Sequence, residues 1–297
     1  MPKFSIVIPC RNRHRLLARA IASVRRQSLG DYELIIVDDG SDPPIEVVLD
    51  ADMPRLRVIR SDQRGAAAAR NLGILASSGD FIAFLDSDDE FLEHKLERVA
   101  EILENDLSAV VYSQVLMDYG DGATVVKPAR GMDVDERLPD YLFCEGATIA
   151  TPALVVPSRL ARTVLWDESL GYGDDSDFVI RLWLHGAHFR FIPEVLVRCD
   201  SAHAEPRLSL AHDADRMQQW VTAMGAHLGR SATLSYRATH LVAMRGWSSP
   251  MTSLCDLYNG IVNGSVSLAT AGKNAARGFL SDALYKFCRL NLLRVKF

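Results

Sequence analysis

The 297-residue chain contains no uninterrupted apolar stretch of about 20 residues, the length that a membrane-spanning helix requires. Its N-terminus enters a strand-like run at Phe4 directly, without the long apolar region of a signal peptide. The five cysteines include no Cys-x-x-Cys pair. A scattered, odd set of cysteines argues against a zinc site and a disulfide framework, and for a reducing compartment. These absences together predict a cytoplasmic protein.

The chain as a whole also lacks an excess of positive charge. The net charge of −5 gives no electrostatic reason to expect nucleic acid as a partner. The exception is the stretch from Gly272 to Phe297, which holds six Lys or Arg residues and one acid, Asp282. Residues 273–297 therefore predict either a basic amphipathic helix on an anionic membrane or a terminal helix with a solvated basic face.

Apolar runs alternate with helical patterns through the first half of the chain. Strands are expected at 4–8, 33–37, 57–60 and 81–85, with helices between them, so the fold class is α/β with a mostly parallel, Rossmann-like sheet flanked by helices. Further strands are expected at 109–113, 115–119, 124–127, 153–156, 188–192 and 195–197. From residue 206 the pattern is helical, which predicts a domain over 1–205 and a helical C-terminal region over 206–297.

The strand expected at 81–85 ends abruptly in three carboxylates, Asp86, Asp88 and Asp89. Side chains at positions i and i+2 of an extended segment point the same way, so Asp86 and Asp88 can converge on one hard divalent ion or on sugar hydroxyls. Asp89 is better explained as the N-cap of a helix over 92–104.

Two other strands also end in polar residues. The first ends at Pro9-Cys10-Arg11-Asn12 and the second at Asp38-Asp39. Ligands of parallel α/β sheets bind beyond the carboxyl ends of the strands, so these groups should gather at one edge. Asp39 suits the N–H of a nucleobase, and Arg70, on the helix before the central strand, suits phosphate as a forked donor.

A second acidic set, Asp174-Asp175-Ser176-Asp177, opens a predicted helix. The helix dipole favours acids there, and capping explains one of the three. A spare carboxylate is a candidate general base for an incoming hydroxyl.

Four segments at this point resemble the GT-A glycosyltransferases of family 2. They are Phe4–Arg13, Glu33–Asp42, Gly65–Gly73 and Phe84–Asp89, and they occur in the family's order within residues 3–200. The resemblance implies an inverting transfer of a sugar from a nucleotide-diphosphate donor, most often a UDP-sugar, to a glycan or lipid-linked acceptor, as in bacterial surface polysaccharide assembly. It implies Mn²⁺ or Mg²⁺ as cofactor, a nucleotide-sugar-binding half over 1–104 and an acceptor-binding half over 105–205.

The family's functional residues carry over position by position. Asp175 becomes the catalytic base, Asp88 the metal ligand with Asp86 and His203 as further candidates, and Asp174 and Trp166 acceptor-binding residues. The nucleotide-binding set is Pro9, Arg11, Asp39, Arg70, Asp86 and Ser87. Asp stands at position 174 where the family has Glu, and the Gln-x-x-Arg-Trp motif of polymerising members is absent, so single-sugar addition is expected. The enzyme is expected in the cytoplasm or peripherally at the inner face of the membrane.

Three other functions fit parts of this pattern. A haloacid-dehalogenase-type phosphatase also uses Asp-x-Asp but needs Thr or Val where Glu90 stands. A sugar-1-phosphate nucleotidyltransferase needs a Gly-rich loop after the first strand, and Pro9-Cys10-Arg11-Asn12 is not one. A nucleotide- or glycan-binding relative without catalysis would not be expected to retain both Asp88 and Asp175.

Overall fold

The computed structural model describes residues 3–45, 55–62, 64–120, 122–200 and 213–280, and the chain forms two compact units. The first unit comprises Met1–Asp135 and Ala147–Leu210, and the second comprises Glu136–Gly146 and Ala211–Phe297. The segment 136–146, which the sequence places with the first domain, therefore belongs to the second unit.

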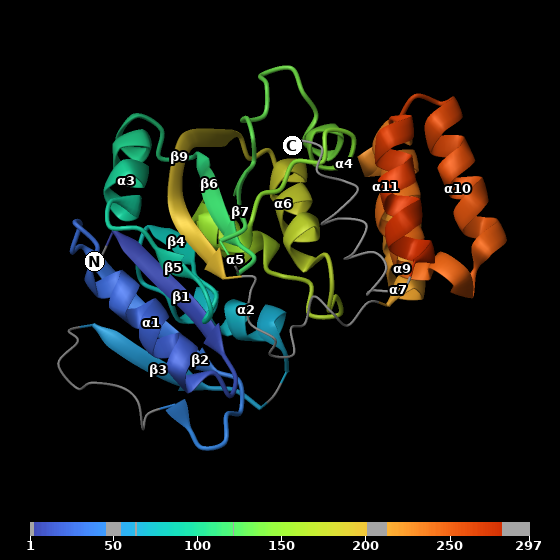
Figure 1. Cartoon of the computed structure of the whole chain (residues 1–297). Coiled ribbons are helices and arrows are strands. Elements are labelled where there is room, and N and C mark those ends of the chain that lie inside the picture. Colours follow the sequence, from blue (N-terminus) through green and yellow to red (C-terminus); the bar gives the residue numbers. More distant parts are fainter. Residues whose placement is uncertain (1–2, 46–54, 63, 121, 201–212, 281–297) are drawn as a thin grey trace. The chain divides into compact units, whose positions relative to one another are not determined.

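A sheet of nine strands forms the centre of the first unit, in the order β3-β2-β1-β4-β8-β6-β9-β5 with β7 paired to β6 (Figure 1). The first four strands of this order are parallel to one another, and the rest of the sheet is mixed. The strands are β1 (Phe4–Cys10), β2 (Tyr32–Asp38), β3 (Leu56–Arg60), β4 (Phe81–Phe84), β5 (Glu90–Phe91), β6 (Val110–Asp118), β7 (Thr124–Lys127), β8 (Val155–Pro157) and β9 (Phe189–Asp200). The α/β fold expected from the sequence is confirmed.

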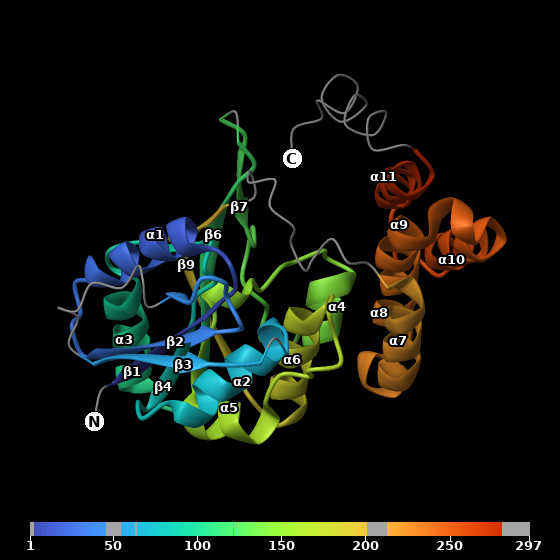
Figure 2. The same ribbon diagram turned by 90° about the horizontal axis from the view of Figure 1, so that it is seen from below.

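Helices cover both faces of this sheet, because its central strands are apolar on both sides. Helices α1 (His14–Arg25) and α3 (Lys95–Asn105) pack against the face that carries Phe4, Ile6 and Ile8. The opposite face carries α2 (Ala66–Ala76), α5 (Ser158–Val164) and α6 (Asp174–Leu184). Figure 2 shows α1 on one side of the strands and α2 and α5 on the other.

Gly73 explains how closely α2 approaches the sheet. A Cβ at this position would lie 2.3 Å from Cγ1 of Val7 on β1. Only glycine fits so close a contact without a shift of the backbone or of Val7. The helix that carries Arg70 is thereby held directly against the central strands.

Two pairs of expected strands turn out to be single strands. The segments 109–113 and 115–119 form one strand, β6, and the segments 188–192 and 195–197 form one strand, β9. The register between them shifts at Ser113 and Gln114, opposite Pro193 and Glu194. Proline has no N–H to donate to the ladder, so it interrupts the apolar pattern at a bulge while the strand continues.

The second unit is helical, as expected for the C-terminal region. Its helices are α4 (Leu138–Phe143), α7 (Ala214–Leu228), α8 (Arg230–Tyr236), a π-helix (Arg237–Leu241), α9 (Val242–Arg245), α10 (Pro250–Val262) and α11 (Leu268–Phe279). The ring of Phe143 packs on that of Tyr236 with centroids 4.9 Å apart, which joins α4 to α8. Among the helices that the structure describes, none is both long and apolar enough to cross a bilayer.

Candidate active site

The loops that follow β1 and β2 are tied together at the carboxyl edge of the parallel strands. The backbone N–H of Asn12 donates to Oγ of Ser41 at 2.9 Å, and the N–H of Asp42 donates to Oδ1 of Asn12 at 2.8 Å. Pro9 lies within β1, paired with Val37, and Arg11 is exposed just beyond the strand. The two strand ends therefore form one edge of the candidate site.

The paired acids at the end of β2 have different roles. Asp38 is buried and accepts from Arg60 at 2.8 Å and from the N–H of Ser41 at 2.9 Å, so it stabilises the loop. Asp39 accepts three hydrogen bonds, from Oγ of Ser61 at 2.8 Å and from the N–H groups of Arg64 and Gly65, each at 2.9 Å. Asp39 thus holds the segment that leads into α2.

Arg70 on α2 joins two acids that are far apart in the sequence. Its Nη2 donates to Oδ1 of Asp86 at 2.8 Å, and its Nη1 donates to Oδ2 of Asp174 at 3.0 Å. The guanidinium lies 4.6 Å from the ring centre of Trp166, an arrangement in which the aromatic face stabilises the cation. The end of β4 and the start of α6 are therefore linked by one buried cation.

Trp166 lies beneath this arginine rather than at the surface. Its indole is 3% exposed and stacks on the ring of Phe178 with centroids 4.2 Å apart. The side chain of Asn71 binds the backbone of Trp166. Its Oδ1 accepts from the backbone N–H at 2.7 Å, and its Nδ2 donates to the backbone carbonyl oxygen at 3.0 Å. In this conformation Trp166 supports Arg70, and its assignment to acceptor binding stays a prediction.

The three acids at the start of α6 differ in their partners. Asp174 pairs with Arg70, and the buried Asp177 pairs with Arg181 at 2.6 Å, which fastens α6 to the end of α5. Asp175 is half-buried, and within the described part of the chain it forms no ion pair; its Oδ1 accepts from the N–H of Ser176 at 2.6 Å. The N-cap of the helix is Gly173, so Asp175 does not cap it.

The environment of Asp175 raises its pKa to about 6. Burial is the main cause, because it disfavours the charged form, and the negative charge of Asp174 adds to it. The N–H of Ser176 and the charge of Arg70 act in the opposite direction. A carboxyl with this pKa is ionised at pH 7 and still able to take up a proton.

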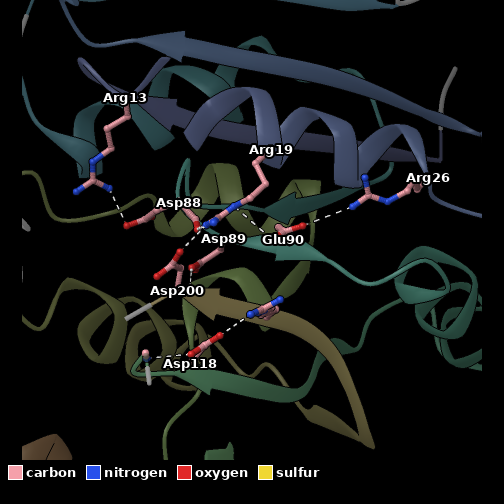
Figure 3. Close-up of polar contacts among 10 residues, drawn as sticks. Arg13, Arg19, Arg26, Asp88, Asp89, Glu90, Asp118 and Asp200 are labelled. Carbon is pink, nitrogen blue, oxygen red and sulfur yellow. Dashed lines mark hydrogen bonds and ion pairs between the residues drawn. The ribbon is translucent and has the colours of Figure 1, made fainter. Parts of the chain in front are cut away.

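The loop after β4 is held by two arginines of the segment around α1 (Figure 3). Arg13 donates to Oδ2 of Asp88 at 2.9 Å. Arg19 donates to the carbonyl oxygen of Asp88 at 2.6 Å and to Oδ2 of Asp200 at 2.8 Å, and its Nε lies 3.3 Å from Oε1 of Glu90. The last residue of β9 is thereby fixed against the acidic loop.

Asp89 does not cap a helix, contrary to the expectation from the sequence. It precedes the short strand β5, and α3 begins only at Lys95. Its Oδ1 accepts from the N–H of Asp200 at 2.9 Å. Burial raises its pKa well above the ordinary value, and the charges of Asp86 and Asp88 raise it further. Asp89 therefore joins β9 to the acidic loop, and the excess negative charge there favours a cation.

The donor set of this loop fits a hard divalent ion in part. Asp86 and Asp88 supply carboxylate oxygens with side chains 28% and 13% exposed, but each already has a guanidinium partner. No group of three His, Cys, Asp or Glu side chains suited to a metal occurs among the described residues. An ion here would need further oxygen ligands from phosphate and water, as Mg²⁺ commonly does. His203 lies outside the described residues.

Several site residues escaped the sequence analysis. Arg13 ends the segment Phe4–Arg13 but was given no role, and Arg19 and Asp200, which carry no motif, are separated by 181 positions. Ser87, expected at the nucleotide, is buried beside the thiol of Cys10, whose pKa burial raises to about 11. The only sequence signal for Arg19 was its place on the polar side of an amphipathic helix, which is shared by Arg25 and Arg26.

Residues 5–152 match the model of the family described as "Glycosyl transferase family 2". A curated relative, the amylovoran biosynthesis glycosyltransferase AmsB of Erwinia amylovora, is 29% identical over 252 residues, covering 80% of this chain and 83% of AmsB. The UDP-Glc:alpha-D-GlcNAc-diphosphoundecaprenol beta-1,3-glucosyltransferase WfgD of Escherichia coli is 37% identical over 107 residues, covering 35% of this chain and 42% of WfgD.

The fold is similar to that of residues 1–349 of S. aureus TarS, solved in complex with UDP-GlcNAc. The TM-score is 0.69 at 16% sequence identity, covering 97% of this chain and 92% of that structure. At this level of identity the similarity concerns the fold.

Proposed function

Residues 5–152 make this chain a member of glycosyl transferase family 2, and we propose that it transfers one sugar from a UDP-sugar to a hydroxyl of a lipid-linked glycan, with inversion and with the help of a divalent metal ion. The chain is a glycosyltransferase; donor, acceptor and mechanism are the proposal.

The observation that carries the proposal is the fork of Arg70. It holds Asp86 at the end of β4 and Asp174 at the start of α6 within hydrogen-bonding distance of one guanidinium. Asp175, the acid with a pKa of about 6, is next in the chain. A cation, a donor-binding carboxylate and a candidate base thus come together at the carboxyl edge of the sheet, where α/β folds bind ligands.

The donor is proposed to lie along this edge. A carboxylate has about four lone-pair sites, and the loop before α2 occupies three of those on Asp39, which leaves one for an N–H of the base. Pro9, Arg11 and Ser87 are proposed to border the nucleotide. Arg70 and Asp86 are proposed to bind the diphosphate and the ribose or sugar.

Asp175 is proposed to act as the general base. The acceptor hydroxyl gives its proton to the Asp175 carboxylate while its oxygen attacks the anomeric carbon. The bond from that carbon to the diphosphate breaks, and the nucleoside diphosphate leaves with the bonding electron pair. A single displacement of this kind inverts the configuration at the sugar.

Asp88, with Asp86, is proposed to hold Mn²⁺ or Mg²⁺ together with phosphate oxygens of the donor. When bound, the ion neutralises charge on the departing diphosphate. Because Arg13 pairs with Asp88 in the described structure, this chain also has a cation of its own at the same carboxylate.

The acceptor is proposed to be lipid-linked because WfgD, by its name, acts on a diphosphoundecaprenol-linked sugar, and AmsB, by its name, belongs to amylovoran biosynthesis. Work on such an acceptor would place the enzyme in the cytoplasm at the inner face of the membrane. The basic residues within 273–297 suit an anionic membrane surface.

A thermal-shift panel tests the donor and the metal together. UDP-, GDP- and dTDP-sugars are compared with Mn²⁺ and with EDTA, and a ligand at 100 times its Kd should raise the free energy of unfolding by about 2.7 kcal/mol. UDP-sugars should stabilise the protein in Mn²⁺ and much less in EDTA. If GDP- or dTDP-sugars stabilise the protein and UDP-sugars do not, the proposed UDP-sugar donor is wrong. Full transfer activity in EDTA would refute the metal assignment.

A further inference from the structure

Among the described residues, helix α10 of the second unit packs one of its faces against the rest of that unit. Ser253, Asp256, Leu257 and Gly260 are buried, and Leu257 belongs to a small core that includes Val242 and Val266. Asp256 pairs with Arg245 at 3.1 Å, with both side chains about nine-tenths buried. The helix is therefore held by this face.

The opposite face of α10 is apolar as well. Met251, Leu254, Tyr258 and Val262 recur at helical spacing, and their side chains are between 54% and 72% exposed. No charged side chain of α10 lies on this face, because its single charged residue is the buried Asp256. A surface helix normally presents charged or polar residues on its outer face, so this stripe is unusual for a face that contacts water alone.

Two more exposed apolar side chains flank α10 in the chain. Trp247, in the turn before the helix, is 72% exposed, and its indole N–H donates to the carbonyl oxygen of Phe279 at 2.8 Å. Leu268, at the start of α11, is 75% exposed. The polar atom of Trp247 is thus satisfied within the protein. One part of its ring packs against Phe279, with centroids 5.1 Å apart, and the exposed part can enter an apolar environment.

Charge indicates what this face binds. Between Asp215 and Asp282 the chain has six Lys or Arg residues and one acid, the buried Asp256. The described surface of this region consequently carries positive charge only, including the exposed Lys273 and Arg277 of α11. Basic side chains around an exposed apolar helix are the pattern of interfacial membrane helices.

We propose that the outer face of α10, formed by Met251, Leu254, Tyr258 and Val262, binds the surface of an anionic lipid bilayer. A second copy of the chain is disfavoured on this face because it would bring two sets of cations together. The segment 281–297 is disfavoured for the same reason, since it adds four cations and one acid. The proposal is independent of the glycosyl-transfer reaction, because all residues proposed for the donor and the base belong to the first unit.

Vesicle sedimentation of the full chain tests this proposal. The wild type should bind phosphatidylcholine vesicles that contain phosphatidylglycerol, and bind pure phosphatidylcholine weakly. Leu254→Glu with Tyr258→Glu should lower the partition coefficient at least tenfold. Leu107→Glu with Val134→Glu, which changes the charge equally at exposed apolar positions of the first unit, should leave it unchanged. If the first variant melts early, Leu254→Ser with Tyr258→Ser replaces it.

Three results would overturn the proposal. One is vesicle binding by the wild type that does not exceed that of the α10 variant. Another is a wild-type dimer, measured by light scattering, that the α10 variant converts to a monomer, because the face would then bind a second copy. The third is vesicle binding that appears only after truncation at Leu280. The nucleotide thermal shift is measured on the same samples, so a failure of the donor proposal is seen separately.

Discussion

Identical side chains in this site differ in what surrounds them. Asp174 and Asp177 each form an ion pair with an arginine, whereas Asp175 between them forms none within the described part of the chain. Burial and the charge of Asp174 raise the pKa of Asp175 to about 6. Asp175 therefore binds a proton more tightly than an ordinary aspartate and is still mostly ionised at pH 7.

Asp175→Asn should separate chemistry from binding. Asparagine keeps the shape of the side chain but cannot take a proton from the acceptor, so kcat should fall by about 10²–10⁴-fold. The Kd for UDP should stay unchanged. The melting temperature at pH 7 should be equal or higher, because the fold disfavours the charged carboxylate. Near-normal turnover would exclude Asp175 and turn attention to Asp174.

The rate should also depend on pH in a way that Asp175 explains. The fold raises its pKa from 3.8 to about 6, so the base is protonated below that value and kcat/KM should fall tenfold per pH unit there. Above pH 7 the base is ionised and this dependence should vanish. A pH-rate profile of the wild type measures this dependence of kcat/KM. Asp177→Asn is not a suitable control, because Asp177 forms an ion pair with Arg181. A flat profile between pH 5 and 7 would contradict the assignment.

Among the elements, the loop between β4 and β5 depends most on its neighbours. It carries Asp86, Asp88 and Asp89, and the repulsion among these acids is offset by arginines from three directions: Arg13 before α1, Arg19 within α1 and Arg70 on α2. Of these, Arg19 touches both the loop and the end of β9. It acts as a positioning residue for the proposed metal ligand.

Arg19→Met should weaken binding of the metal without removing a ligand. The carbonyl oxygen of Asp88 and the carboxylate of Asp200 would lose a shared donor, and Mn²⁺ affinity should fall by about 10- to 100-fold, the usual effect of an outer-shell partner. Titration of Mn²⁺ in the presence of UDP, followed by electron paramagnetic resonance, measures this.

The matched control for that experiment is Arg26→Met. Arg26 is the C-cap residue of the same helix, and its exposed guanidinium lies 3.5 Å from Oε2 of Glu90. Its replacement should leave Mn²⁺ affinity unchanged. Equal losses in the two variants would show that the contacts of Arg19 with Asp88 and Asp200 do not position the metal ligand.

At the scale of the whole molecule, charge and chemistry are divided between the two units. The chain has a net charge of −5, yet the stretch between Asp215 and Asp282 has an excess of five positive charges, six against one. Every described residue proposed for the donor, the metal or the base belongs to the first unit. The exposed apolar face of α10 belongs to the second.

This division predicts that donor binding and lipid binding can be lost separately. Arg70→Lys removes the fork that holds Asp86 and Asp174, because an ammonium cannot span both carboxylates as a guanidinium does. UDP affinity should fall about tenfold, or about 1.4 kcal/mol, while vesicle binding stays unchanged. Calorimetry and sedimentation on one preparation measure both, and a joint loss would show that the units do not act independently.

The sequence alone determined where the parallel strands and their polar ends lie. Buried strands read as unbroken apolar runs, and a run that stops at acids marks both a strand end and a candidate site, as at Asp39 and Asp86. The sequence predicted Arg70 as a forked donor to phosphate, and its contacts with Asp86 and Asp174 came from the structure. The helical pattern of the sequence predicted that the C-terminal region is helical. It could not predict the apolar outer face of α10, because apolar residues of a helix are normally buried.

Only the tertiary structure decided which groups meet. Asp89 appeared to be a helix cap because a cap depends on neighbours in sequence, whereas its true partner is the N–H of Asp200, 111 positions away. Trp166 was predicted to bind the acceptor, and only the structure showed that its ring is buried in contact with Phe178 and Arg70. The sequence placed Arg19 on the polar side of a helix but could not give its partners, because its contacts with Asp88 and Asp200 depend on strand order. That order follows from packing over the whole chain, and no local period encodes it.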